Sequence, residues 1–308
     1  MRKIIIIFPL FLIAVGLIGG IIVQQNISIV SSANPQTLGA VLADQQIPTS
    51  IPTMTPTPMP LPPLPLISAQ SYIIEAQDSD NPIIESNSHH RFPPASTTKI
   101  MTAMVALKSY DPSQIVTIKN PYSVGATIGL VEGEQISIEK LLYGLLLPSG
   151  NDAAMALADA YPQGQDQFIK QMNLLAHQLN LQDTQFANPS GLDHPDHYST
   201  AQDLVTLSKI AMTHELFQQI VATKKAIVKS QDESITHVLV NRNELLGEMG
   251  VIGIKTGYTL TAGEVLVTNL VRKSGSYYIV VMGSEDRFTD SKLLIDWLDD
   301  YLGTYKLP

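Results

Sequence analysis

Three short motifs in this sequence could together carry out serine-based hydrolysis. They are Ser96–Lys99 (S-x-x-K), Ser149–Asn151 (S-x-N) and Lys255–Gly257 (K-T-G). A lysine three residues after a serine lies on the same face of a helix, where its amine can take the proton of the hydroxyl. Such a lysine must be neutral, which requires burial or a second cation close by. The spacing therefore predicts a serine nucleophile activated by a lysine.

Each of these motifs also occurs a second time, so no single match identifies a site. The second copies lie at Ser137–Lys140, Ser79–Asn81 and Lys273–Gly275. Ser137 begins a predicted helix that continues to Ser149, so these two side chains cannot easily converge on one pocket. The other two copies fall in predicted hairpin turns, where side chains are solvated. We therefore interpret the first set as the site and the second copies as unrelated to it.

Five residues are candidates for the chemical step. Ser96, at the predicted start of a buried helix, is the candidate nucleophile and Lys99 the candidate base. Burial of that helix start, together with the charge of Lys255, would keep the base neutral. Ser149, in a predicted break between two helices, can relay the proton to the leaving amine. The backbone N–H groups of Ser96 and Tyr258 are expected to form an oxyanion hole.

The second and third motifs also offer groups for binding a substrate. Asn151 can bind a substrate amide, and Lys255 with Thr256 offers a positive charge and a hydroxyl donor that suit a carboxylate. Gly257 leaves room for close backbone approach in an apparent edge strand, to which an extended substrate can pair. The alternative interpretation is structural: the serine caps a helix and both lysines extend toward solvent.

The composition excludes several other functions. The chain has 308 residues, no cysteine, and a formal net charge of −9. A disulfide framework, a thiolate zinc site and a cysteine nucleophile are therefore excluded, and an acidic chain without a basic block argues against nucleic acid as a partner. Metalloprotease, α/β-hydrolase, P-loop and dinucleotide-binding motifs are missing, while His194 and His197 lie in a loop rich in Gly, Asp and Pro. We expect neither a metal nor a cofactor.

The elements that must position these residues follow from hydrophobic periodicity. Strands are predicted at 71–76, 81–86, 235–241, 264–271 and 277–283, and helices at 96–110, 137–147, 151–160, 165–180 and 288–302. Thr200 begins a capping box ahead of a further helix. Strands therefore occur near both ends of the folded part, and helices lie between them. This order predicts an α+β fold, with an antiparallel sheet built from both ends and a helical subdomain inserted between them.

The N-terminal part of the chain differs from the rest. Residues 4–23 are twenty apolar residues, enough to span about 30 Å of bilayer, and 1–3 carry the basic residues that hold an N-terminus in the cytoplasm. We predict an uncleaved transmembrane anchor there; the alternative is a cleaved signal peptide. Within 24–66, eight of the eighteen residues from Pro48 to Pro65 are proline, which predicts an extracytoplasmic linker. The catalytic domain is predicted at 67–308.

The globular part resembles the serine-type D-alanyl-D-alanine carboxypeptidases, the low-molecular-mass penicillin-binding proteins of peptidase family S11. The resemblance rests on PPASTTKIMTA, GLVEGEQISIEKLLYGLLLPSGNDAAMALA, FANPSGLD, HYSTAQDL and GIKTGYTLTAG, in the order of the family, and covers about residues 70–300. It implies the β-lactamase/transpeptidase-like, penicillin-recognising fold. It also implies hydrolysis of the terminal D-Ala-D-Ala bond of peptidoglycan stem peptides and covalent inhibition by β-lactams. The family roles fall on Ser96, Lys99, Ser149, Asn151 and Lys255.

Two departures from the family pattern bear on the function. Many members carry a β-rich C-terminal domain and a C-terminal amphipathic membrane helix, and we expect neither here. The chain also lacks, between Ser149 and Lys255, the E-x-x-L-N motif that class A β-lactamases use for deacylation. A membrane-anchored carboxypeptidase with an extracytoplasmic catalytic domain is therefore the main hypothesis. A DD-endopeptidase of the same family stays open, and a β-lactamase or an inactive wall-binding module is a lesser alternative.

Overall fold

The computed structural model describes residues 61–304 of the chain. The predicted cytoplasmic residues 1–3, the predicted anchor 4–23 and the linker as far as residue 60 lie outside this part. Within 61–304, no helix is both long enough and apolar enough to cross a bilayer.

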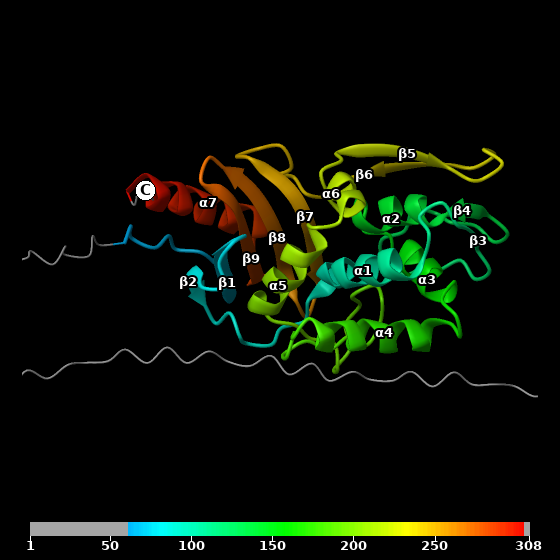
Figure 1. The fold of residues 1–308 in the computed structure, drawn as a ribbon, viewed down its shortest axis with the longest axis horizontal. Coiled ribbons are helices and arrows are strands. Elements are labelled where there is room, and N and C mark those ends of the chain that lie inside the picture. Colours follow the sequence, from blue (N-terminus) through cyan, green and yellow to red (C-terminus); the bar gives the residue numbers. More distant parts are fainter. Residues whose placement is uncertain (1–60, 305–308) are drawn as a thin grey trace, which may run out of the picture. The chain divides into compact units, whose positions relative to one another are not determined.

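A five-stranded antiparallel sheet combines strands from both ends of the described chain (Figure 1). Its order is β2-β1-β9-β8-β7, with β1 at Ser71–Ala76, β2 at Pro82–Ser86, β7 at Val251–Thr259, β8 at Gly263–Arg272 and β9 at Gly275–Ser284. All neighbouring pairs are antiparallel, and β1 lies between β2 and β9. The prediction of one sheet built from both ends is confirmed, and β7, which carries the K-T-G motif, is an edge strand.

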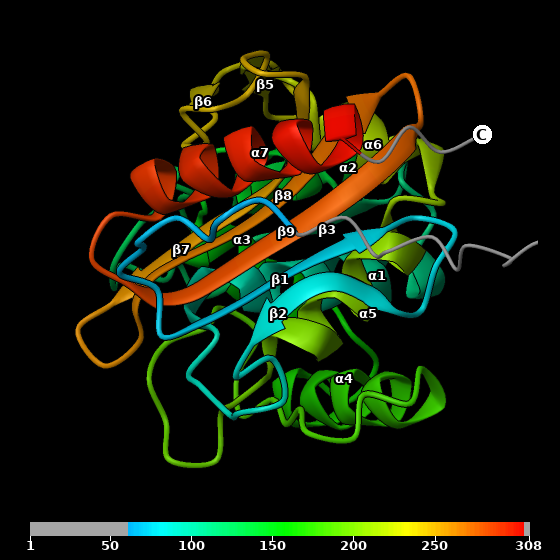
Figure 2. The ribbon, with the colours of Figure 1, turned by 90° about the vertical axis from the view of Figure 1, so that its left-hand side faces the viewer.

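Alternate residues of the central strands face two separate apolar layers. Ile74 and Leu266 pack with α7 (Arg287–Thr304), which contributes Trp297 to that layer. Figure 2 shows this helix lying across one face of the sheet. Ile73 and Val265 face the opposite layer, where the sheet meets α1 (Lys99–Ser109) and α5 (Ala201–Ala211). The two-residue period of a strand is what divides the side chains between these layers.

The helical subdomain lies between β2 and β7 in the sequence. It contains α1 and α5 together with α2 (Ile138–Leu146), α3 (Asn151–Asp159), α4 (Gln165–Gln178) and α6 (Glu215–Val221). Thr200 caps α5 by accepting a hydrogen bond from the backbone N–H of Asp203, as the capping box predicts. The predicted α+β class with an inserted helical subdomain is therefore confirmed.

Two short ribbons in this region are not evident from the sequence pattern. One pairs β3 (Ile115–Thr117) with β4 (Gln135–Ser137), and the other pairs β5 (Lys225–Lys229) with β6 (Thr236–Val240). The sequence predicts strand 235–241 but gives it no partner, and β6 stays outside the main sheet. The β5–β6 ribbon instead reaches out over α2 (Figure 1). Its alternation explains this placement, because His237 and Leu239 are buried while Val238 and Val240 are exposed.

Candidate active site

Ser96 lies in a tight turn that connects the sheet to α1. Residues Ala95–Thr98 form a 3-10 turn, and Ala95 has a φ of +48°, in the left-handed region. Thr97 tightens this turn by donating its hydroxyl to the carbonyl of Pro94 at 2.6 Å. Ala95 and Thr97 are buried, whereas Ser96 is partly exposed and lines a pocket of about 180 Å³. The buried residues of the turn therefore hold Ser96 so that it faces the pocket.

Lys99 is fully buried directly behind that serine. Its Nζ lies 3.0 Å from Ser96 Oγ and 2.7 Å from Asn151 Oδ1, and it also donates to the carbonyl of Ser190. Burial, followed by the positive charge of Arg242, lowers the pKa of Lys99 from 10.5 to about 7. A substantial fraction of Lys99 is therefore a neutral amine near pH 7, and only this form can accept a proton from Ser96.

Ser149 occupies the break between α2 and α3. It has a φ of +68°, and its buried Oγ lines the pocket without a hydrogen-bond partner among residues 61–304. The sequence expects Ser149 to relay a proton. In this structure, the hydrogen bonds of Lys99 go to three other residues. An unpartnered hydroxyl at the pocket surface is free to bond an incoming group.

Asn151 links the first motif to the pocket wall. Its backbone N–H donates to the carbonyl of Ala126 at 2.6 Å, and its Nδ2 donates to the carbonyl of Val124 at 2.9 Å. Its Oδ1 accepts from Lys99. Asn151 therefore orients the base and holds segment 124–126 against the pocket.

Asp152 supports the pocket wall from outside the pocket, a role that the sequence did not reveal. Its buried carboxylate accepts the backbone N–H groups of Ile128, Gly129 and Leu130 at 2.9 to 3.2 Å. These bonds fix the loop that continues from the pocket wall at 124–126. The sequence contained one indication of such a role, because an acidic residue at the start of a predicted helix can bind unpaired N–H groups. The identity of those groups depends on the tertiary structure.

The third motif places β7 against the Ser96 turn. Thr256, Gly257 and Tyr258 line the pocket, and a Cβ added to Gly257 would lie 3.0 Å from the backbone nitrogen of Ser96. This is the close approach that the sequence predicts for Gly257. Both candidate oxyanion-hole residues, Ser96 and Tyr258, therefore border the pocket. The oxyanion hole itself stays a prediction.

Lys255 is buried and does not itself line the pocket. Its Nζ donates to the carbonyl of Thr256 at 2.9 Å. Burial, followed by the charges of Lys99, Arg242 and Arg287, lowers its pKa well below the usual value. The sequence expects Lys255 to supply the cation that keeps Lys99 neutral, but the cation that lowers the pKa of Lys99 is Arg242. The charged form of Lys255 is itself disfavoured, by burial first and then by the neighbouring cations.

Two arginines in the pocket carried no signal in the sequence. Arg242 lies two residues beyond β6, and Arg287 begins α7. Arg287 donates to the carbonyl of Gly257 at 2.9 Å and lies 3.6 Å from the carboxylate of Glu264. A guanidinium remains charged at every relevant pH and suits a carboxylate. The two residues thus bring permanent positive charge to the pocket.

The second copies of the motifs have structural roles away from this pocket. Ser137 caps α2 by accepting from the N–H of Lys140, whose ammonium donates to the carbonyl of Lys229 at 2.8 Å. Ser79 bonds within the β1–β2 turn. Lys273 is exposed at the β8–β9 turn. The structure therefore places none of them at the pocket, as the sequence analysis predicts.

The two histidines of the Gly/Asp/Pro-rich loop differ in burial. His194 is exposed, whereas the Nε2 of the buried His197 lies 2.7 Å from Thr98 Oγ1. Burial, followed by the charge of His194, lowers the pKa of His197 to about 4, so this ring is neutral. His197 therefore supports the turn that carries the nucleophile. In the described part of the chain, no cluster of three or more acidic or histidine side chains could hold a metal ion.

Comparison with known proteins defines the class. The crystal structure of the Streptomyces K15 DD-transpeptidase matches with a TM-score of 0.73 at 32% identity, covering 76% of this chain and 98% of that one. A D-alanyl-D-alanine carboxypeptidase from Mycobacterium tuberculosis H37Rv also matches with a TM-score of 0.73, at 33% identity, covering 78% and 94% of the two chains. The chain therefore has the fold of the penicillin-recognising proteins.

Sequence comparison narrows this class to a family. The sequence profile of the D-alanyl-D-alanine carboxypeptidases, peptidase family S11, matches residues 58–286. DacB2 of Mycobacterium tuberculosis is 35% identical over 76% of this chain and 84% of its own length. DacD of Salmonella typhimurium is 34% identical over 80% of this chain, a match that spans 66% of that relative's length. The chain belongs to the D-alanyl-D-alanine carboxypeptidase family of serine peptidases.

Proposed function

We propose that this chain is a D-Ala-D-Ala carboxypeptidase that removes the terminal D-alanine from peptidoglycan stem peptides. The observation that carries the proposal is the pair formed by Ser96 and Lys99. The hydroxyl lies 3.0 Å from the Nζ of Lys99, whose pKa is about 7, and it faces a pocket lined by the other two motifs. The family membership supports the same activity.

The proposed reaction proceeds through an acyl-enzyme. Neutral Lys99 takes the proton of Ser96, and Oγ forms a bond to the carbonyl carbon of the penultimate D-alanine. The C–N bond then breaks, and the proton returns through Ser149 to the amine of the departing D-alanine. Water hydrolyses the ester and restores Ser96. The backbone N–H groups of Ser96 and Tyr258 would stabilise the oxyanion in both steps.

The proposed substrate carboxylate binds beside the third motif. Thr256 offers a hydroxyl donor at the pocket surface, Arg242 offers a permanent charge there, and Lys255 lies buried next to them. A carboxylate that arrives near Lys255 would raise its lowered pKa and so favour the charged form of the amine as substrate binds. Asn151 would bind the substrate amide, and the edge strand β7 would pair with the extended peptide.

The proposed location is the outer face of the cytoplasmic membrane. Residues 4–23 would form the single membrane span, and the linker 24–66 would carry the catalytic domain toward the wall. This proposal rests on the sequence of those residues. Membrane fractionation, followed by protease treatment of intact cells, tests it: the domain should sediment with membranes and be cut from outside. Release of the protein into the medium would instead support a cleaved signal peptide.

Labelled penicillin tests the acyl-enzyme. The wild-type chain should form a covalent adduct that survives denaturation, and Ser96→Ala should abolish it while the far-UV circular dichroism stays unchanged. Ser137→Ala, which alters the second S-x-x-K copy, should label like the wild type. Labelling of Ser96→Ala at the wild-type level would overturn the assignment, and a wild-type chain that does not label would favour a wall-binding module.

Product analysis separates the remaining activities. Incubation with a stem pentapeptide should release D-alanine, whereas a cross-linked muropeptide should be cut far more slowly. The opposite preference would identify a DD-endopeptidase. Rapid turnover of the labelled penicillin, in place of a persistent adduct, would identify a β-lactamase.

A further inference from the structure

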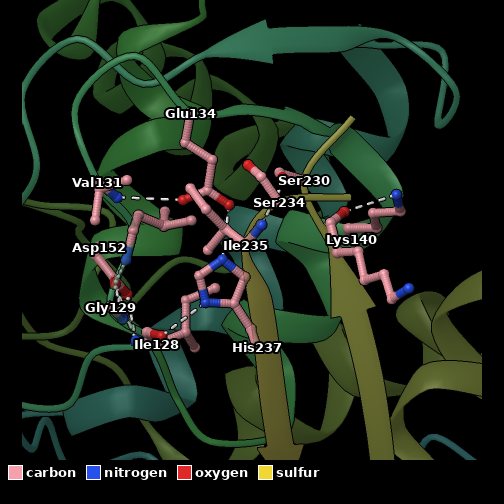
Figure 3. A network of polar contacts seen from close by, with 12 residues as sticks. Ile128, Gly129, Val131, Glu134, Lys140, Asp152, Ser230, Ser234, Ile235 and His237 are labelled. Carbon is pink, nitrogen blue, oxygen red and sulfur yellow. Dashed lines mark hydrogen bonds and ion pairs between the residues drawn. The ribbon is translucent and has the colours of Figure 1, made fainter. Parts of the chain in front are cut away.

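A buried hydrogen-bonded pair, His237 and Glu134, links the β5–β6 ribbon to the loop behind the pocket wall. His237 on β6 lies between two partners: its Nδ1 is 3.0 Å from the carbonyl of Ile128, and its Nε2 is 2.6 Å from Oε1 of Glu134. The other oxygen of Glu134 accepts the N–H of Val131 at 3.2 Å. Figure 3 shows the imidazole between these groups. The side chains of His237 and Glu134 are 4% and 0% exposed, so water cannot substitute for either partner.

The chemistry of these contacts fixes the orientation of the ring. A backbone carbonyl only accepts hydrogen bonds, so Nδ1 of His237 carries a hydrogen. Nε2 of His237 and Oε1 of Glu134 then share one further hydrogen, and this contact holds the imidazole in its orientation. Without Glu134, the carbonyl of Ile128 would lose an oriented donor.

Ile128 is held at both of its backbone polar groups. Its N–H donates to the carboxylate of Asp152 at 2.9 Å, and its carbonyl accepts from His237. Its side chain also packs against the Ser149 turn, because a Cβ added to Gly150 would lie 3.1 Å from its Cγ2. Ile128 is thus fixed between the β5–β6 ribbon, α3 and the second motif.

From Ile128 the chain leads directly into the active site. Ala126, two residues earlier, lines the pocket and accepts the N–H of Asn151, and Asn151 in turn binds the Nζ of Lys99. The same ribbon also leads, five residues beyond His237, to Arg242, whose charge lowers the pKa of Lys99. A displacement of the ribbon relative to the loop would therefore affect Lys99 in two ways: through the position of Asn151 and through the position of Arg242.

We propose that His237 and Glu134 are positioning residues for the reaction, which act by holding Ile128 and through it the pocket wall and Asn151. They touch neither Ser96 nor the pocket. The effect falls on the acylation step, because the chain of contacts ends at the base. This proposal rests on the proposed function for its kinetic test, whereas its structural half is measurable without any activity.

A matched pair of variants at residue 134 separates the hydrogen bonds from the charge and the volume. Glu134→Gln removes the charge but keeps both bonds, since an amide can donate to Nε2 of a neutral His237 and accept from Val131. Glu134→Leu has a similar volume and keeps neither bond. His237→Leu removes both ring contacts. Leu239→Ala, at a buried position on the same strand, is the control that loosens the ribbon but keeps both hydrogen bonds of His237.

Two measurements on the full chain test the proposal. The first is the acylation rate with labelled penicillin, normalised to folded protein. Glu134→Leu and His237→Leu should lose about tenfold or more, because small displacements of reacting groups are costly, while Glu134→Gln and Leu239→Ala stay within about twofold. The second is hydrogen exchange of a peptide spanning 121–131. It should speed up in the two leucine variants and stay slow in Glu134→Gln and Leu239→Ala.

The outcomes separate this proposal from the proposed function. A wild-type chain that is not acylated would overturn the proposed function, and the exchange measurement would still report on the loop. Equal acylation rates and equal exchange in Glu134→Leu and Glu134→Gln would overturn the positioning role. A loss of acylation in Leu239→Ala as large as that in His237→Leu would also overturn it, since general loosening of the ribbon would then explain both. If His237→Leu does not fold, the comparison of Glu134→Leu with Glu134→Gln is sufficient to test the positioning role.

Discussion

Gly257 in β7 lies so close to the backbone of Ser96 that a single methyl group on its Cα would clash with the turn that carries Ser96. A Cβ at Gly257 would lie 3.0 Å from the Ser96 nitrogen, 3.0 Å from the Cβ of Ala95 and 3.2 Å from the carbonyl of Pro94. Two of these three neighbours are backbone atoms, which cannot rotate away. The glycine of the third motif therefore sets the distance between β7 and the nucleophile turn.

We expect Gly257→Ala to impair acylation more than stability. The added methyl group should push the Ser96 turn away from β7, which costs about 1 to 3 kcal/mol of folding free energy as overpacking. The displaced nucleophile should lower the acylation rate by about tenfold or more. Labelled-penicillin kinetics and thermal unfolding measure the two effects. Gly303→Ala, in α7 with open space around its Cβ, is the control and should leave acylation unchanged. Wild-type acylation by Gly257→Ala would contradict the steric argument.

The acylation rate should depend on the protonation of Lys99. Its pKa of about 7 lies below the ordinary 10.5, and only the neutral amine accepts the proton. The second-order rate with penicillin should therefore rise by about tenfold per pH unit below pH 7 and level off just above it. Rates measured across this range determine the midpoint.

Arg242 provides an internal control for this pH dependence. Its charge lowers the pKa of Lys99, so Arg242→Gln should move the midpoint of the profile to higher pH. A flat profile in the wild type would exclude Lys99 as the base. An unchanged midpoint in Arg242→Gln would mean that burial alone sets the pKa.

The cations beside the third motif should discriminate between a free and an amidated substrate terminus. Lys255→Gln and Arg242→Gln should each weaken kcat/KM on a D-Ala-D-Ala peptide by about 1 to 3 kcal/mol, as expected for a lost charge-assisted contact. At a pH above the Lys99 midpoint of every variant, the losses should nearly vanish on the analogue with an amidated terminus. Lys255→Arg should recover only part of the activity, because a planar guanidinium fits a different geometry.

The same comparison shows which residue contacts the carboxylate. For each of the two variants, Lys255→Gln and Arg242→Gln, kcat/KM is compared with that of the wild type on the free and on the amidated peptide. The difference between the two losses gives the coupling between that side chain and the terminal charge. Equal losses of Lys255→Gln on the two substrates would mean that Lys255 acts through Lys99 or through the fold. Selective loss in Arg242→Gln alone would assign the carboxylate to the arginine.

The start of the catalytic domain can be tested by truncation. The indole N–H of Trp297 in α7 donates to the carbonyl of Pro62 at 3.1 Å, and Ser68 bonds Asp290 through its backbone N–H at 3.0 Å. A chain that starts at residue 67 keeps the second contact and loses the first. It should be soluble and active, as the sequence predicts, but about 0.5 to 1.5 kcal/mol less stable than a chain starting at residue 61.

Thermal unfolding and penicillin labelling of the two truncated chains check this expectation. Trp297→Phe in the longer chain is the matched control, because it removes the same hydrogen bond without shortening the chain. Insoluble or unlabelled protein from both start points would contradict the domain boundary. Identical stability of the two chains would show that the Pro62 contact contributes nothing.

The sequence by itself determined the features whose cause is local. The S-x-x-K spacing places Ser96 and Lys99 on one helical face, and the structure brings their side chains within 3.0 Å. Thr200 caps its helix for an equally local reason. Alternating apolar residues also revealed most strands of the main sheet. In these cases, the residues that decide the structure lie within a few positions of one another.

Only the tertiary structure decided which distant groups meet at the site. Arg242 follows a strand that was predicted without a partner, and an isolated arginine after a strand carries no periodic signal. Asp152 binds N–H groups of a loop more than twenty residues away, and His237 binds Glu134 across 103 positions. Such pairs form because packing of the ribbon and the helices brings their backbones together. The residues next to each partner in the sequence do not predict that packing.

The sequence also could not show which cation lowers the pKa of Lys99. The sequence predicted burial for Lys99, because it follows the start of a buried helix, and it offered Lys255 as a second cation. Which cation lowers the pKa of the base depends on which charges the fold brings close to it. Lys255 and Lys99 are both buried, yet Arg242 is the charge that lowers the pKa of the base. Only the assembled site, in which burial and charge act together, could decide this.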